Sequence, residues 1–268
     1  MKEIANMQSS EISRALESWY AKARNEVLWD STRARLQPIL DLAFGYHVLQ
    51  LGPLPGRRLI DGSPINHRIV AGPCHDGAAP VDLCCHGDEL PLDSDSVDML
   101  VAFHALEFDA HPHGCLREMQ RVLRPRGHLV IIGFNPRSLL GAYKAMHGLR
   151  RSGLWHHHQP VSLHRLTDWL HLLDCELESV QHLFPLPPSA SPRFRRMAEK
   201  LDQWAMGHRL PGGSVYIAHA IKQIAGMRRP VRKPATLRVL PGLAVAAGGR
   251  ARSGTVGRSA SHLRDVEQ

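Results

Sequence analysis

The 268-residue sequence lacks any apolar run near the roughly 18 residues of a membrane-spanning helix, so it predicts no such span. Its N-terminal segment lacks the apolar centre of a secretory signal and carries acidic residues early. Both absences favour a cytoplasmic protein. With 43% hydrophobic residues, the chain can still bury one sizeable core, with room for a small appendage.

None of the five cysteines belongs to a C-x-x-C pair, the spacing typical of zinc and redox sites. Buried, reduced thiols are therefore expected, with Cys84 and Cys85 pointing to opposite faces of a strand. Three consecutive histidines at 156–158 cannot all face one ion, and no cysteine or acid stands at ligand spacing near them. His111 and His113 share one side of an extended segment but have no evident third ligand. We therefore predict no metal site.

The net charge of +8 is concentrated at the C-terminus. From Lys222 onward there are 10 basic and 2 acidic residues, whereas the preceding residues hold 23 of each sign. The body of the chain therefore shows no large nucleic-acid footprint. The tail is either a disordered, solubilising extension, which its few aromatic residues favour, or a weak RNA-binding segment.

The spacing of apolar residues predicts an amphipathic helix over 11–26 and a second helix that starts after Ser31 and ends near Gly45. Further helices are expected over 112–123 and from Ser162. Short apolar runs predict strands over 46–51, 67–71, 80–85, 97–103, 128–134, 176–184 and 214–221. A Pro-rich insert and a basic helix at about 193–206 separate the last two strands.

Alternating strands and helices predict an α/β fold, in the form of a Rossmann-like, seven-stranded, mostly parallel sheet with helices on both faces. The last two strands lack a simple crossover, which favours one antiparallel edge strand. We divide the chain into an N-terminal helical segment (1–30), a Rossmann-like domain (31–224) and a basic, disordered tail (225–268).

Two motifs carry a resemblance. Residues 88–107 read Asp-Glu-Leu-Pro-Leu-Asp-Ser-Asp-Ser-Val-Asp-Met-Leu-Val-Ala-Phe-His-Ala-Leu-Glu, and residues 116–131 read Leu-Arg-Glu-Met-Gln-Arg-Val-Leu-Arg-Pro-Arg-Gly-His-Leu-Val-Ile. Both resemble the central part of class I S-adenosylmethionine-dependent methyltransferases of the type 11-like group. Residues 45–52 and 133–136 resemble a proteobacterial branch of that family. The resemblance extends over roughly residues 30–222 and implies S-adenosylmethionine as the cofactor.

Ligands of such sheets bind at the carboxyl ends of the strands, beside the first strand. The resemblance implies that the cofactor-binding residues are Gln50, Gly52, Gly56, His86, Gly87 and Phe103. Several of the family's usual features are altered in this sequence. Gln50 replaces an acid, Leu54 replaces the middle glycine of the loop, His86 stands where another acid is expected, and Ala71-Gly72 ends the second strand without an acid. We expect Leu54 to intrude where the backbone should approach the cofactor, and cofactor binding to be weak.

His104 follows the fourth expected strand and faces the expected substrate pocket. It is either a general base that takes a proton from the methyl acceptor or a polar residue that closes the strand end by local bonding. Glu107 is expected to cap or orient the following turn. The chain is then a methyltransferase acting on a small molecule. The alternative is a catalytically inactive scaffold of the same fold that binds a protein or RNA partner.

Overall fold

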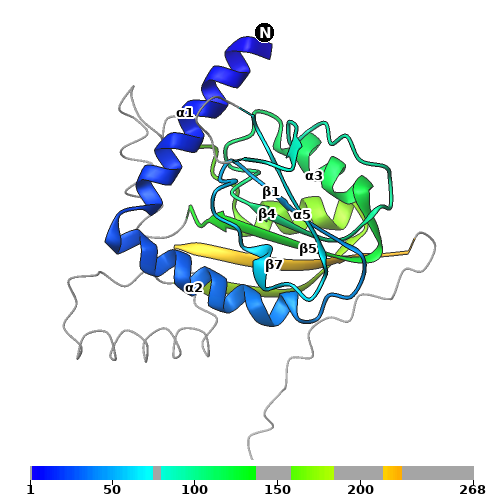
Figure 1. Cartoon of the computed structure of the whole chain (residues 1–268). Coiled ribbons are helices and arrows are strands. Elements are labelled where there is room, and N and C mark those ends of the chain that lie inside the picture. Colours follow the sequence, from blue (N-terminus) through cyan, green and yellow to red (C-terminus); the bar gives the residue numbers. More distant parts are fainter. Residues whose placement is uncertain (1, 75–79, 137–157, 184–213, 225–268) are drawn as a thin grey trace, which may run out of the picture. The chain divides into compact units, whose positions relative to one another are not determined.

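The computed structural model describes residues 2–74, 80–136, 158–183 and 214–224 (Figure 1). Three expected features lie outside these residues, namely the basic helix near 193–206, positions 156 and 157 of the histidine triplet, and the tail from 225 onward. No helix within the described ranges is both long and apolar enough to cross a membrane.

A seven-stranded sheet forms the centre of the described chain, with the strand order β3-β2-β1-β4-β5-β7-β6. The strands are β1 (His47–Leu51), β2 (His67–Gly72), β3 (Leu83–Cys84), β4 (Val97–Phe103), β5 (Leu123–Phe134), β6 (Cys175–Leu183) and β7 (Val215–Lys222). Strands β1 to β5 pair in parallel, and β7 runs antiparallel to both β5 and β6. The predicted fold class is confirmed. The antiparallel strand is β7, which lies next to the edge strand β6.

The helices are α1 (Lys2–Tyr20), α2 (Ala23–Leu40), the 3-10 turn η1 (Ile60–Gly62), α3 (Pro112–Val122) and α5 (Leu163–Leu172). The first helix therefore ends earlier than predicted, and α2 begins at Ala23 instead of after Ser31. Ser31 lies inside α2, where its hydroxyl donates to the Val27 carbonyl at 2.7 Å, a bond that lets serine sit in a helix interior. The predicted cap at Ser162 is confirmed, since its side chain accepts from the Arg165 amide.

The two faces of the sheet carry different helices, because side chains alternate along each strand. Leu49 and Leu100 pack in one core with the buried residues of α3 and α5. Val48 and Val101 pack in the other core with those of α1 and α2. Figure 1 shows the sheet between these two helical layers. Burial on both faces explains why β1 and β4 read as continuous apolar runs.

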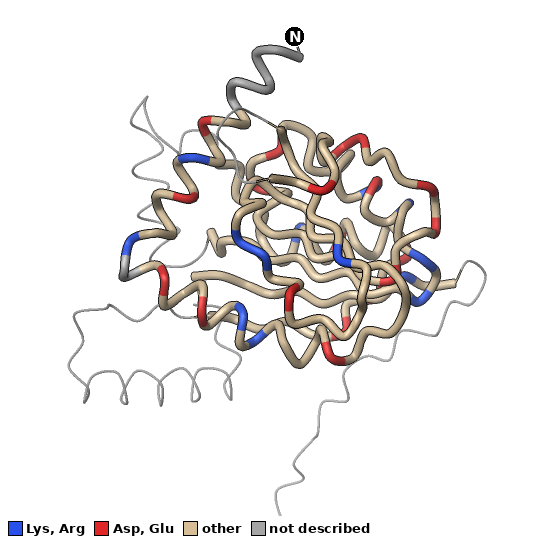
Figure 2. Tube along the Cα trace, in the orientation of Figure 1, with Lys and Arg blue, Asp and Glu red and all other residues tan. Residues whose placement is uncertain are grey.

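Two expectations about the surface have different outcomes. Lys and Arg are interspersed with Asp and Glu along the described chain, as the balanced charge of the body predicts (Figure 2).

The expectation of reduced, buried cysteines is wrong for Cys74 and Cys84. Their sulfur atoms are bonded, with Cα atoms 5.4 Å apart, because the chain after β2 runs beside β3. Cys85 is a half-buried free thiol, and Cys115 and Cys175 are buried free thiols.

Candidate functional site

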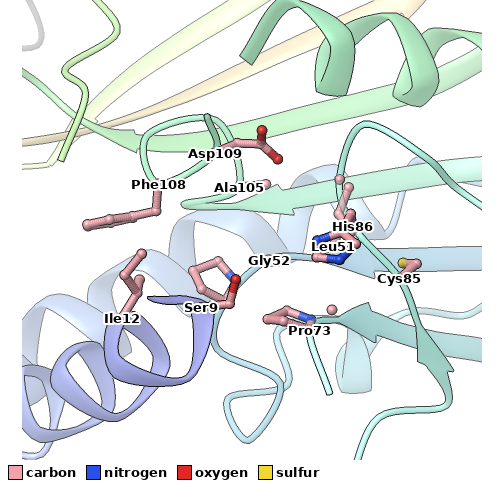
Figure 3. A pocket seen from close by; sticks show the side chains of 13 residues that line it. Ser9, Ile12, Leu51, Gly52, Pro73, Cys85, His86, Ala105, Phe108 and Asp109 are labelled. Atoms are coloured by element: carbon pink, nitrogen blue, oxygen red, sulfur yellow. The ribbon is translucent and has the colours of Figure 1, made fainter. Parts of the chain in front are cut away.

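A cavity of about 480 Å³ lies where the carboxyl ends of β1, β2, β3 and β4 meet (Figure 3). Helix α1 borders the cavity through Ser9 and Ile12. The strand ends and the loops after them contribute Leu51, Gly52, Pro53, Gly72, Pro73, Cys85, His86, Gly87, Ala105, Phe108 and Asp109. The cavity therefore occupies the usual ligand position of an open α/β sheet, beside its first strand.

Glycines allow the strand ends to approach one another at the base of this cavity. A Cβ atom at Gly52 would lie 2.0 Å from the Phe103 carbonyl oxygen, and one at Gly72 would lie 2.6 Å from the Gly52 carbonyl oxygen. Neither position can bear a side chain without moving the backbone. The end of β2 therefore cannot present an acid at Gly72, and the base of the cavity there is main chain.

Gln50 shapes the loop that follows β1. Its side chain is buried, and its Nε2 donates to the Arg57 carbonyl at 2.8 Å while its Oε1 accepts from the Leu59 amide at 2.6 Å. An amide supplies both a donor and an acceptor, whereas an ionised carboxylate only accepts. An acid at position 50 would place an acceptor against the Arg57 carbonyl. The glutamine therefore suits this loop better than the family's acid would.

Leu54 does not intrude into the cavity, and that expectation is wrong. Its side chain is 1% exposed and belongs to the core formed with α1 and α2. The preceding residue, Pro53, does line the cavity, and its carbonyl accepts from the Ser13 hydroxyl of α1 at 2.5 Å. The loop thus turns its apolar side chain into the core and attaches its backbone to α1.

Among the described residues that line the cavity, Asp109 is the only acidic one. Its Oδ1 accepts from the His111 amide at 2.8 Å. Burial is the main cause that raises the pKa of this carboxyl group, and the nearby charge of Asp88 raises it further. The sequence analysis missed Asp109 because it followed the methyltransferase-like motif only as far as Glu107. The available signal was its position just after β4, the strand that pairs with β1.

The six residues predicted to bind the cofactor divide into two groups. Gly52, His86 and Gly87 line the cavity. Gln50 and Phe103 are buried beneath it, and Gly56 is exposed on a separate groove. The structure thus brings together the residues after β1 and β3 and adds α1 and the loop after β4, which the sequence analysis did not assign to the site.

His104 lies in a buried network that joins three elements. Its Nε2 is 2.6 Å from the Tyr20 hydroxyl of α1, and its Nδ1 is 2.7 Å from Oε2 of Glu107. Oε1 of Glu107 accepts from the Phe134 amide at the end of β5. Because a carboxylate accepts, the Nδ1–H tautomer fits this network, and Nε2 then accepts from Tyr20. Burial, followed by the charge of Glu107, raises the pKa of Tyr20.

This geometry bears on both hypotheses for His104. The side chain is fully buried and is not among the residues that line the cavity. Its bond to Glu107 is local, as the second hypothesis has it, whereas its bond to Tyr20 joins it to α1, and its φ of +53° places the residue in a sharp turn after β4. The role of general base stays a prediction. Glu107 connects His104 to β5, so its contacts reach further than the following turn.

Asp88, Asp109 and His111 form a cluster beside the cavity. Their potential ligand atoms lie within 4.8 Å of one another. The sequence analysis found no third ligand for His111, because the two carboxylates come from different loops that only the fold brings together. The His111 and Asp88 side chains are 76% and 39% exposed, and Nδ1 of His111 is 3.7 Å from Oδ2 of Asp88. These three residues are the group within the described chain that could hold a cation.

Sequence comparisons point to one family. Residues 63–131 match the model of a methyltransferase domain. The chain is 31% identical over 153 residues to the uncharacterized protein YafS of Escherichia coli, a match that covers 57% of this chain and 62% of that protein. It is 27% identical over 124 residues to a malonyl-[acyl-carrier protein] O-methyltransferase of Marinomonas, covering 44% and 45% of the two chains. The chain thus spans less than two thirds of the curated relatives that it matches.

Structural comparison extends the similarity to most of the described fold. An S-adenosylmethionine-dependent methyltransferase from Thermotoga maritima, a possible histamine N-methyltransferase, superposes with a TM-score of 0.59 at 16% identity. That match covers 81% of this chain and 99% of the other. A putative methyltransferase of Haloferax volcanii, in complex with the activator Trm112, gives a TM-score of 0.55 at 17% identity, covering 81% and 100%. The chain is therefore similar to methyltransferase domains in its central segment, and it shares the fold of solved S-adenosylmethionine-dependent methyltransferases.

Proposed function

We propose that this chain binds S-adenosylmethionine in the cavity at the strand ends and transfers its methyl group to a small molecule. The observation that carries the proposal is the Asp109 carboxylate, the one acidic group among the described residues that line a cavity at the ligand position of the fold. It supplies the negative charge that the altered positions at Gln50 and His86 do not.

The lining residues fit the parts of the cofactor. Ile12, Leu51 and Phe108 offer apolar surface for the adenine ring, and Asp109 offers a carboxylate for the cationic methionine end. Gly52 and Gly87 present backbone without side chains. When bound, the cofactor supplies a methyl group on a positively charged sulfur.

The chain's own contribution to methyl transfer is positioning and exclusion of water. Helix α1 borders the cavity and is attached to the loop after β1 through Ser13 and to β4 through Tyr20. Holding the acceptor and the methyl group in line accounts for a large part of catalysis in reactions of this kind. We assign His104 and Glu107 to positioning, since they connect α1 to the ends of β4 and β5.

One observation favours the alternative of an inactive scaffold. The end of β2 reads Ala71-Gly72-Pro73, so it offers no acid for the ribose hydroxyls that family members usually bind there. The two hypotheses differ in whether the cavity binds the cofactor product. A ligand present at 100 times its Kd stabilises a protein by about 2.7 kcal/mol. For a domain of this size, that corresponds to a Tm increase of about 5–10 °C.

Thermal unfolding with S-adenosylhomocysteine tests the proposal. We expect a saturable Tm increase in the wild-type protein. Ala105→Phe should abolish it, because Ala105 lines the cavity and the larger ring would fill it. Ala34→Phe is the matched control, since Ala34 is exposed on α2 and the increase should persist. No Tm increase at millimolar ligand would refute the methyltransferase proposal and favour the scaffold.

A further inference from the structure

A second hollow lies on the far side of the loop after β1. This open groove of about 720 Å³ is lined by Glu17, Ala21, Trp29, Gly56, Arg57 and Arg58. Within it, the guanidinium carbon of Arg57 lies 5.3 Å from the centre of the Tyr20 ring and 5.2 Å from that of the Trp29 ring. These distances fall within the range of cation–π contacts, so two aromatic rings hold the Arg57 head in place.

The Arg57 guanidinium group contacts two aromatic rings, but no ion pair within the described residues balances its positive charge. In the described part of the chain, no carboxylate forms an ion pair with its guanidinium group, although Glu17 lines the same groove. The neighbouring Arg58 differs, since it pairs with Asp61 at 3.2 Å and with Asp82 at 3.8 Å. Contacts with ring faces do not use the in-plane N–H donors of a guanidinium group. Arg57 therefore retains donors for a group that enters the groove.

We propose that Arg57 binds a carboxylate or phosphate group of the methyl acceptor, so that the substrate class is a small anionic molecule. A rigidly held guanidinium fork matches the two oxygens of such a group in a bidentate arrangement. This inference rests on the proposed methyltransferase function, because it takes the neighbouring cavity as the place where methyl transfer occurs.

The groove and the cavity are fixed relative to each other by shared elements. Helix α1 lines the cavity with Ile12 and the groove with Glu17, five residues apart, which is about 7.5 Å along a helix axis. The loop after β1 lines the cavity with Pro53 and the groove with Gly56. The Gln50 side chain donates a hydrogen bond to the Arg57 carbonyl. The groove and the cavity therefore share α1 and the loop after β1 as walls, and the inference takes the methyl acceptor to extend around this loop from Arg57 to the cavity.

Trp29 provides a direct probe, because it contacts the Arg57 head. The full-length chain, which has five tryptophans, would be labelled with 5-fluorotryptophan, and Trp29→Phe would assign the Trp29 resonance. Inorganic phosphate and malonate are then titrated separately at constant ionic strength, and fluorine NMR is recorded without cofactor. We expect a saturable shift of the Trp29 resonance in the millimolar range with at least one anion, and the anion that acts identifies the group. Arg57→Gln should abolish the shift. Arg33→Gln, an exposed change on α2, the helix that carries Trp29, should preserve it.

Two results would overturn the inference. One is the absence of a saturable shift with either anion, and the other is a shift that persists in Arg57→Gln. If Arg57→Gln fails to fold, Arg57→Lys takes its place, because lysine keeps the charge and loses the fork. That variant should bind several-fold more weakly, and unchanged affinity would contradict the bidentate site. Since no cofactor is present, failure here leaves the S-adenosylhomocysteine result unaffected, so the two proposals fail separately.

Discussion

Replacing Tyr20 by phenylalanine isolates the contact that attaches α1 to the end of β4. The change removes one hydroxyl and keeps the ring that packs against Phe103 and Arg57. Tyr20 is 1% exposed and His104 is fully buried, so His104 loses a partner that water does not readily replace. The loss of such a buried bond costs about 1–3 kcal/mol. We therefore expect the free energy of unfolding of Tyr20→Phe to fall by that amount.

Urea unfolding at neutral pH measures this loss as a lower midpoint with an unchanged slope. Tyr46→Phe is the matched control, because Tyr46 is 73% exposed and its free energy of unfolding should change by less than about 0.5 kcal/mol. Hydrogen exchange gives a second readout, since each 1.4 kcal/mol of local destabilisation speeds exchange about tenfold. The α1 amides near Tyr20 should exchange faster in the variant. A midpoint that matches the control would refute the view that the Tyr20–His104 bond secures α1.

Four further predictions concern the loop, the sheet and the tail. Leu54→Ala should lower the free energy of unfolding by about 2–5 kcal/mol in urea titrations, because Leu54 is a core residue. Gln50→Asp should also lower the free energy of unfolding, and tighter cofactor binding in that variant would contradict the loop geometry. Burial, with a contribution from His128, lowers the pKa of His219 from 6.5 to about 4, so the unfolded chain takes up a proton there that the folded chain does not. Stability is then full above pH 6.5 and falls on acidification towards pH 4 by up to about 1.4 kcal/mol per pH unit, and urea midpoints across this range should fall less steeply in His219→Phe. Deleting 227–268 should leave the Tm of the body nearly unchanged in a thermal scan, and a large drop would show that the tail packs on it.

The sheet was largely predictable because its strands are buried on both faces. Segments such as 97–103 read as uninterrupted apolar runs, and β4 has those bounds. Helix ends were predicted less well. Ser31 looks like an N-cap in the sequence, but its hydroxyl bonds to the Val27 carbonyl within α2. Only the tertiary packing of Leu28 into the core distinguishes a serine inside the helix from one that caps it.

The site was only partly predictable, because its residues meet through long-range contacts. The family motif predicted Gly52, His86 and Gly87 as cofactor-binding residues, and all three line the cavity. It also suggested that Leu54 blocks the cofactor, which fails because the direction of a loop side chain depends on the core beneath it. Ser9 and Ile12 lie 38 and 35 residues before the start of β1 in sequence, and no local pattern indicates that α1 borders the cavity.

The most direct test of the cofactor site is the affinity for S-adenosylhomocysteine, measured by titration calorimetry in the wild type and in Asp109→Asn. The wild type should bind, and loss of the carboxylate should weaken binding by about 10- to 100-fold, since a charged hydrogen bond contributes about 1.5–3 kcal/mol. Asp93→Asn, an exposed change away from the cavity lining, should bind like the wild type. Equal affinity in Asp109→Asn and the wild type, or no detectable heat at millimolar ligand, would contradict the assignment of this cavity to the cofactor.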